Sequence, residues 1–207
     1  MKATSNKQTD QIGQVDRIDR ALAVTGAVVR GVAADQWVLS TPCPEWDVRA
    51  LVNHLVGGLR LFTAALTGMP AADHDSDWLG MDPVAAWTAA AAADAAAWRH
   101  PGALDGTLEI SLGPVPGALG GVIHVTEIIT HGVDLAVATG QEDLLDEELI
   151  DDLLATMRAL GVDAFRVPGV FGPEVAMDPG RPVHLRLLAF LGRPISAPMA
   201  IATTALG

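Results

Sequence analysis

Apolar residues recur at steps of three and four along most of the chain, which is the pattern of helices that bury one face. The second such stretch shows it clearly, with apolar side chains at Val48, Leu51 and Val52 and again at Leu55 and Val56. The pattern predicts helices at Asp10–Ala33, Val48–Leu66, Pro83–Trp98, Ala118–Ala138, Leu149–Leu160 and Leu185–Leu191. The chain is therefore expected to be a helical bundle.

Capping and helix-breaking residues mark the ends of these helices. Asp47 and Asp82 precede the second and third helices, where an aspartate carboxylate can accept from the free amides of the first turn. Gly140 suits the left-handed position after the fourth helix. Between the third and fourth helices, Thr107–Leu112 alternates like a β-strand, and Gly113–Gly117 is expected to close it as a turn. We expect a short strand or hairpin there, as decoration.

The composition agrees with a single all-α domain. Half of the 207 residues are hydrophobic but only 4% are aromatic, and long alanine-rich stretches favour helix over strand. A chain of this length can bury one sizeable core. We assign residues 10–195 to the bundle, residues 1–9 to a disordered N-terminal tail and residues 196–207 to a flexible C-terminal tail.

The net charge and the single cysteine limit the partners and the compartment. The formal charge of −12 repels phosphate backbones and anionic headgroups, so neither nucleic acid nor a membrane is an expected partner. A lone Cys43 fits a reducing compartment, and the polar N-terminal residues do not form a secretory signal, so we expect a cytoplasmic protein. The sequence leaves open whether Cys43 is a nucleophile or a packing residue.

The fourth predicted helix carries three polar side chains on one face. At about 100° per residue, His124, Glu127 and His131 fall within roughly 60° of one another. A carboxylate and an imidazole one turn apart can both reach a single ion. A third ligand must come from elsewhere, and His54, on an otherwise apolar helix, is the candidate. Two imidazoles and one carboxylate suit one Zn²⁺ ion, with Ni²⁺ or Fe²⁺ as alternatives.

Each of these residues also has an interpretation without a metal. A glutamate and a histidine spaced by four on a helix often form a surface ion pair, and a lone buried histidine is often hydrogen-bonded within the core. His124 is either a group that relays a proton or a packing residue hydrogen-bonded within the bundle. The spacing alone leaves these alternatives open.

Three segments of the chain resemble a known family. The run from Trp37 to Gly58, which contains Thr-Pro-Cys-Pro-Glu-Trp-Asp, is similar to the opening motif of the mycothiol-dependent maleylpyruvate isomerase N-terminal family, within the DinB/YfiT-like superfamily. The run Glu127–Gly140 is similar to the second motif of that family. A third run, Phe171–Glu174 followed by Arg186–Arg193, is similar to the end seen in its actinobacterial metal-binding branch.

This resemblance implies a DinB-like four-helix bundle that binds one divalent metal through His54, Glu127 and His131. It further implies a metal-dependent thiol transferase or isomerase, in which a low-molecular-weight thiol such as mycothiol is activated to attack a small electrophilic substrate. In this scheme His124 relays a proton and Asp134 orients a ligand. The chain has no length left for the C-terminal domain of the isomerase, so maleylpyruvate itself is not the expected substrate.

A different class of function fits the same scaffold. A bundle of this superfamily can be a non-catalytic metal-binding or small-ligand-binding domain that acts as a sensor or protein partner, because family membership fixes the scaffold better than the chemistry. A homodimer is also compatible with the sequence. Thiol consumption by the zinc-loaded protein would distinguish an enzyme from such a domain.

Overall fold

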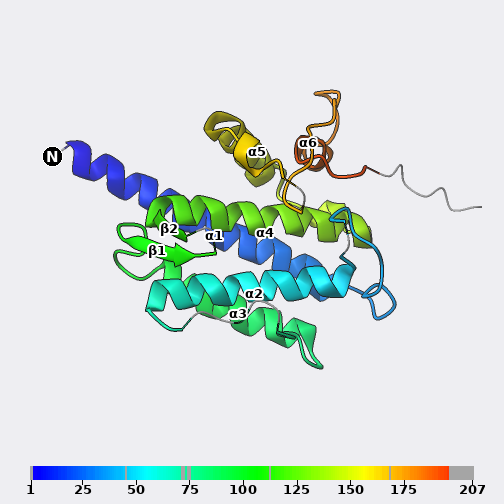
Figure 1. Cartoon of the computed structure of the whole chain (residues 1–207), viewed down its shortest axis with the longest axis horizontal. Helices are drawn as coiled ribbons and strands as arrows, with labels where there is room; N and C mark the ends of the chain where they lie inside the picture. Colours follow the sequence, from blue (N-terminus) through cyan, green and yellow to red (C-terminus); the bar gives the residue numbers. More distant parts are fainter. Residues whose placement is uncertain are drawn as a thin grey trace, which may run out of the picture.

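The computed structural model describes residues 2–44, 46–70, 73, 76–111, 113–167 and 169–195, with the backbone alone for residues 2–12. Its centre is a bundle of four helices, which are α1 (Lys2–Gly31), α2 (Val48–Thr67), α3 (Pro83–Trp98) and α4 (Gly117–Thr139). α1 packs along α4, and α2 packs against both α3 and α4 (Figure 1). The prediction of a mostly helical, DinB-like fold with a short β decoration is confirmed.

The predicted helix caps are present. The Asp47 carboxylate accepts from the amide of Ala50 at 2.8 Å, and that of Asp82 accepts from the amide of Ala85 at 2.9 Å. Each such cap is worth about 1 kcal/mol. α4 ends at Gly140, whose φ of 70° is the left-handed conformation that glycine adopts without strain. The caps therefore fix where α2 begins and where α4 ends.

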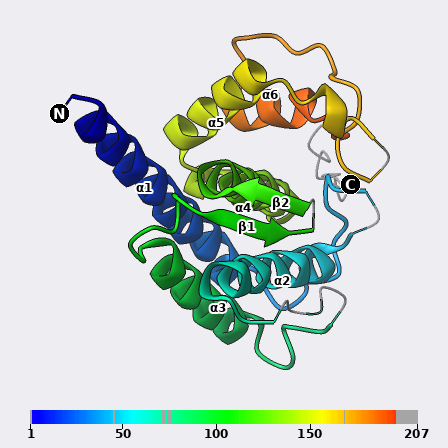
Figure 2. The ribbon, with the colours of Figure 1, turned by 60° about the vertical axis from the view of Figure 1, so that its left-hand side comes forward.

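α1 is longer than the periodicity predicts. It begins at Lys2 rather than at Asp10, and so includes residues 2–9 of the segment that the composition assigns to a tail. That segment has no apolar period, but a helix that is already nucleated can extend at low cost, since each added residue brings one backbone hydrogen bond. The N-terminal end of α1 projects beyond the rest of the bundle (Figures 1 and 2).

The β decoration is an antiparallel hairpin of β1 (Thr107–Ile110) and β2 (Gly113–Pro116). The sequence predicts the second segment to be a turn, and this is wrong, because Gly113 pairs with Ile110 and the register continues to Pro116. The two prolines of β2 misled the prediction. An edge strand tolerates them, since a proline there need only avoid the positions that donate to the ladder.

Two further helices lie on the opposite side of α4 from α2 and α3 (Figure 2). They are α5 (Glu147–Leu160) and α6 (Val183–Phe190), and α6 packs against both α5 and α4. Short 3₁₀ turns lie at Glu142–Leu144 and Asp163–Phe165. The C-terminal helix predicted at Leu185–Leu191 is thus present with slightly shifted ends. The predicted tail at 196–207 lies outside the described residues.

A glycine brings α4 close to α1. A Cβ atom built on Gly132 would lie 2.5 Å from the Thr25 hydroxyl oxygen, which is closer than any real side chain tolerates. The same hydroxyl donates to the carbonyl of Ile128 at 3.3 Å. These two contacts restrict the rotation of α4 about its axis, and so they hold its polar face toward α2.

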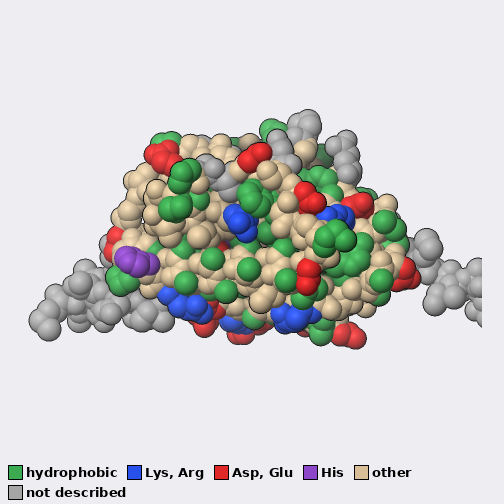
Figure 3. All heavy atoms as spheres, turned by 90° about the horizontal axis from the view of Figure 1, so that it is seen from below, with side chains coloured by type: hydrophobic (Ala, Val, Ile, Leu, Met, Phe, Trp, Pro, Cys, Tyr) green, Lys and Arg blue, Asp and Glu red, His purple; other side chains and the backbone are tan. Residues whose placement is uncertain are grey.

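α2 and α4 are long and apolar enough, by length and composition, to span a membrane. Buried helices of water-soluble proteins pass the same test, and most of α4 is buried inside this bundle. Of the apolar stretch, 67% is buried in α4 and 44% in α2. The outer face shown in Figure 3 carries acidic and basic side chains of mixed sign among scattered apolar ones.

Candidate metal centre

Three potential metal ligands meet where α2 passes α4. His54 comes from α2, and Glu127 and His131 lie one turn apart on α4. The Nε2 atom of His54 lies 3.4 Å from Oε2 of Glu127, and Nε2 of His131 lies 3.5 Å from the same oxygen. One ligand atom from each residue lies within 4.8 Å of the other two. The structure thus brings together the three residues that the sequence proposes as ligands.

The spacing of these atoms fits a divalent metal. Zinc binds imidazole nitrogen and carboxylate oxygen at about 2.0–2.2 Å, so two ligand atoms of a tetrahedral site lie roughly 3.3–3.5 Å apart. The nitrogen-to-oxygen distances of 3.4 and 3.5 Å agree with that separation. Two imidazoles and one carboxylate also form a donor set that catalytic zinc sites use with a fourth position free. The residues present therefore fit the metal that the sequence suggests.

A buried carboxylate lies behind one of the imidazoles. Oδ2 of Asp134 lies 3.1 Å from Nδ1 of His131, and Asp134 has no exposed surface. In the neutral imidazole, a proton on Nδ1 donates to this carboxylate and leaves the lone pair of Nε2 available to a metal. Metal-binding histidines commonly have such a partner, because it fixes both the tautomer and the orientation of the ring. Asp134, proposed from the sequence as a catalytic residue, therefore acts on the imidazole of His131.

A tryptophan that the sequence analysis missed packs on both imidazoles. The Trp46 ring centroid lies 4.4 Å from that of His54 and 5.5 Å from that of His131. Its carbonyl accepts from the hydroxyl and the amide of Thr41, which folds the connector back over the start of α2. The sequence did contain a signal for this residue, because Trp46 directly precedes Asp47, the cap of α2. The indole shields one side of the ligand cluster from water.

The cluster opens to solvent on the Glu127 side. The exposed fraction of the Glu127 side chain is 45%, against 21% for His54 and 8% for His131. A small molecule that approaches from solvent therefore meets Glu127 and His54 first. His131, Asp134 and Trp46 form the inner wall of the centre.

The charges of the cluster shift the pKa values of two of its members. Burial raises the pKa of Glu127, but the hydrogen bonds and charges of His131 and His54 lower it more, so the net shift is strongly downward. Burial lowers the pKa of His131, but the carboxylates of Asp134 and Glu127 outweigh burial and raise that pKa to about 9. In the metal-free protein Glu127 is therefore ionised and His131 is protonated at neutral pH.

Zinc binding is expected to release a proton and to tighten as the pH rises. A pKa of about 9 means that a metal must displace the proton from Nε2 of His131, so the affinity should rise about tenfold per pH unit between pH 7 and pH 9. Calorimetry in buffers of different ionisation enthalpy measures the released proton. A zinc affinity that is flat between pH 7 and pH 9 would exclude His131 as a ligand.

The raised pKa of His131 also affects the stability of the metal-free fold. It stabilises that fold below about pH 6.5, and the contribution disappears as the pH rises toward 9.

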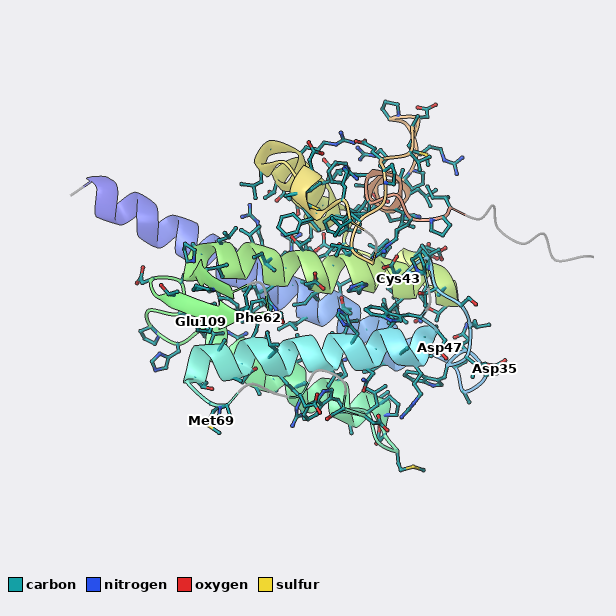
Figure 4. All side chains as sticks on the ribbon, viewed as in Figure 1. Asp35, Cys43, Asp47, Phe62, Met69 and Glu109 are labelled. Atoms are coloured by element: carbon teal, nitrogen blue, oxygen red, sulfur yellow. The ribbon has the colours of Figure 1, made fainter. Side chains whose placement is uncertain are left out.

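His124 lies outside the ligand cluster. It is 1% exposed, and its Nε2 atom lies 2.8 Å from Oδ2 of Asp94, a fully buried carboxylate on α3. The rings of Phe62 and Trp98 lie against the imidazole, at centroid distances of 4.3 and 5.4 Å. Figure 4 shows Phe62 far along α2 from Asp47, which marks the start of that helix. Of the two interpretations of His124, these contacts favour the packing residue over the proton relay.

Cys43 lies beside the centre as a neutral thiol. Its sulfur, His131 and Asp134 form a second group whose potential ligand atoms lie within 4.8 Å of one another. Figure 4 places Cys43 on the connector near the C-terminal part of α4. Burial raises the pKa of the Cys43 thiol to about 11, whereas reactive cysteines have lowered pKa values and exposed sulfur. Cys43 is therefore protonated at neutral pH and packs against the inner wall.

Comparison with known proteins places this centre in a family context. The family model described as the mycothiol maleylpyruvate isomerase N-terminal domain matches residues 18–136, a range that contains all three candidate ligands and Asp134. Two relatives, both uncharacterized proteins from strains of Mycobacterium tuberculosis, are 40% identical over 179 residues, which is 85% of this chain and 95% of each relative. No solved structure matches the chain significantly.

Proposed function

This chain belongs to the mycothiol maleylpyruvate isomerase N-terminal domain family, and from that membership we propose that it is a zinc-dependent thiol transferase or isomerase. In this proposal a low-molecular-weight thiol, mycothiol by family, attacks a small electrophilic substrate. The observation that supports it most strongly is the arrangement of two imidazole nitrogens, from His54 and His131, around one oxygen of Glu127. Such a half-exposed donor set fits a metal that must also receive a substrate.

Each residue of the centre has a role in this proposal. His54, Glu127 and His131 would hold the metal, and a bound metal would lower the pKa of a coordinated thiol so that thiolate forms near neutral pH. Glu127 contributes a negative charge on the side that solvent reaches. Asp134 keeps the proton of His131 on Nδ1, and Trp46 excludes water from the inner side of both imidazoles.

Zinc is the metal that this donor set favours, with nickel and iron as the alternatives. Imidazole nitrogen is a suitable ligand for all three ions. Two imidazoles with one carboxylate form a donor set of borderline softness, which suits zinc best. Elemental analysis of protein expressed with each metal in excess would identify the ion retained at one equivalent. We place the enzyme in the cytoplasm, where low-molecular-weight thiols are kept reduced.

Thiol consumption tests the proposal directly. Zinc-loaded protein mixed with a thiol and a reactive electrophile is expected to consume the thiol at least tenfold faster than the His54→Ala variant, because that variant lacks a ligand on the solvent side. The control is His100→Ala, which changes an exposed histidine after α3 that is absent from the cluster. Equal rates for wild type and His54→Ala, with zinc still bound to the wild type, would favour the non-catalytic metal-binding alternative.

A further inference from the structure

A buried arginine from the C-terminal segment reaches the back of the metal centre. Arg193 follows α6 and is only 6% exposed, although it carries a permanent charge. Its Nη2 atom lies 3.5 Å from Oδ2 of Asp134, the oxygen that also faces His131. Its Nη1 atom donates to the carbonyl of Val170 at 3.5 Å. A charge at this depth is costly unless it is paired, and Asp134 is the carboxylate with which it pairs.

Among the described residues, two side chains hold Asp134. Oδ2 faces both Nδ1 of His131 and the guanidinium of Arg193, whereas Oδ1 is buried and has no hydrogen-bond partner among the described residues. A carboxylate with one unpartnered oxygen can rotate about its last side-chain bond unless the other oxygen is fixed. His131 alone fixes it by a single contact. Arg193 supplies the second contact, from a direction outside α4.

We propose that Arg193 is a positioning residue of the metal centre, which holds Asp134 so that His131 presents Nε2 toward Glu127. The inference rests on the proposed metal centre but not on the thiol chemistry. It links the ligand to a part of the chain beyond residues 18–136, the range that the family model covers. The line of contacts runs from Arg193 through Asp134 and His131 to Glu127.

Docking of the C-terminal segment and metal binding are then thermodynamically coupled. The backbone amide of Arg193 donates to the carbonyl of Leu188 at 2.9 Å, so the arginine is anchored to the end of α6. If Arg193 improves metal affinity, a bound metal must stabilise the docked Arg193 by the same factor. The C-terminal segment therefore completes the centre without contributing a ligand.

Zinc affinities of three variants test this role. Arg193→Met keeps much of the apolar stem but removes the charge that holds Asp134, and it is expected to weaken zinc binding by up to the ~10–100-fold that loss of a ligand's own outer partner costs. Arg193→Lys should restore part of the loss, since it keeps the charge with a different geometry. The matched control is Arg186→Met on α6, which removes an ion pair with Asp151 and should change the affinity less than about twofold.

The sign of the effect separates positioning from simple electrostatics. A positive charge near a metal repels it, so tighter binding in the presence of Arg193 requires the placement of Asp134 and His131. Zinc binding by Arg193→Met that equals or exceeds the wild type would overturn the proposal, and so would an equal loss in Arg186→Met. The visible spectrum of the cobalt-loaded protein should also change in Arg193→Met alone, because it reports ligand geometry.

Hydrogen exchange on the wild type tests the same coupling without a variant that must fold. Zinc is expected to slow exchange of the Arg193 amide, while exchange of the Gly161 amide at the end of α5 should stay within error. Equal exchange of the Arg193 amide with and without zinc would overturn the coupling. If the wild type binds zinc without consuming thiol, the proposed function fails and the role of Arg193 stands. If it binds no zinc, both fail.

Discussion

Glu127→Gln is expected to weaken zinc binding by more than the ~100-fold that loss of an outer partner can cost. Glutamine has the same size but no charge, and Oε2 of Glu127 is the atom that both Nε2 atoms approach. The substitution therefore removes the carboxylate ligand that the described part of the chain contributes to the open side of the cluster. Thiol consumption should fall to the rate of metal-free protein. Competition with a chelating indicator measures the zinc affinity.

The fold should survive this change. The Glu127 side chain is 45% exposed, and the amide oxygen of glutamine can still accept from the buried Nε2 of His131, so the fold loses a charge but no acceptor. Glu148→Gln on α5 is a suitable control, because it removes a charge from an exposed ion pair with Arg20. Zinc affinity in Glu127→Gln that matches this control would show that the carboxylate is not a ligand.

The Asp94→Ala substitution should produce the largest loss of stability. Asp94 and the His124 that it contacts are 0% and 1% exposed, and leaving a buried polar group without its hydrogen-bond partner typically costs about 1–3 kcal/mol. The apolar rings of Phe62 and Trp98 lie against the His124 imidazole, so water does not readily replace the lost carboxylate. Urea unfolding monitored by circular dichroism measures the change in free energy.

Zinc affinity and the double variant complete this test. The affinity of folded Asp94→Ala should remain close to that of the wild type, since His124 lies outside the ligand cluster. Replacing both Asp94 and His124 with leucine is expected to recover most of the lost stability, because no polar group is then left unpaired. A large loss of thiol consumption in that double variant, with zinc bound, would instead revive the proton-relay interpretation of His124.

Local sequence signals predicted the parts of the fold that local interactions determine. Asp47 and Asp82 cap α2 and α3, and Gly140 ends α4, because each cap depends on a few neighbouring residues. Glu127 and His131 share a face for the same reason, since the helix repeat alone places them one turn apart. His54 was a candidate because it lies on an otherwise apolar helix, and the family resemblance named the same residue, whereas spacing alone cannot show which helices become neighbours.

Contacts between distant segments could not be predicted in this way. The sequence could not decide whether His124 relays a proton or packs in the core. Its partner Asp94 belongs to another helix and lies in an alanine-rich stretch without a motif. In the sequence, Arg193 is notable only as the last residue of a segment that resembles the family. Its contact with Asp134 could not be predicted, because it depends on how α6 docks on α4. The first residues of α1, from Lys2 onward, carry no apolar periodicity from which a helix could be predicted. Tertiary packing decides the first two, whereas the extension of α1 follows from the low cost of adding residues to a helix that is already nucleated.

The position of Trp46 gives the protein an internal fluorescent reporter. An indole in contact with a protonated imidazole loses emission by electron transfer, and Trp46 lies on both imidazoles of the centre. Loss of the proton from His131 therefore changes the light that Trp46 emits, whether a base or a metal removes it. The occupancy of the site can be read from the unlabelled chain, with Trp46→Phe to identify the signal among the other tryptophans.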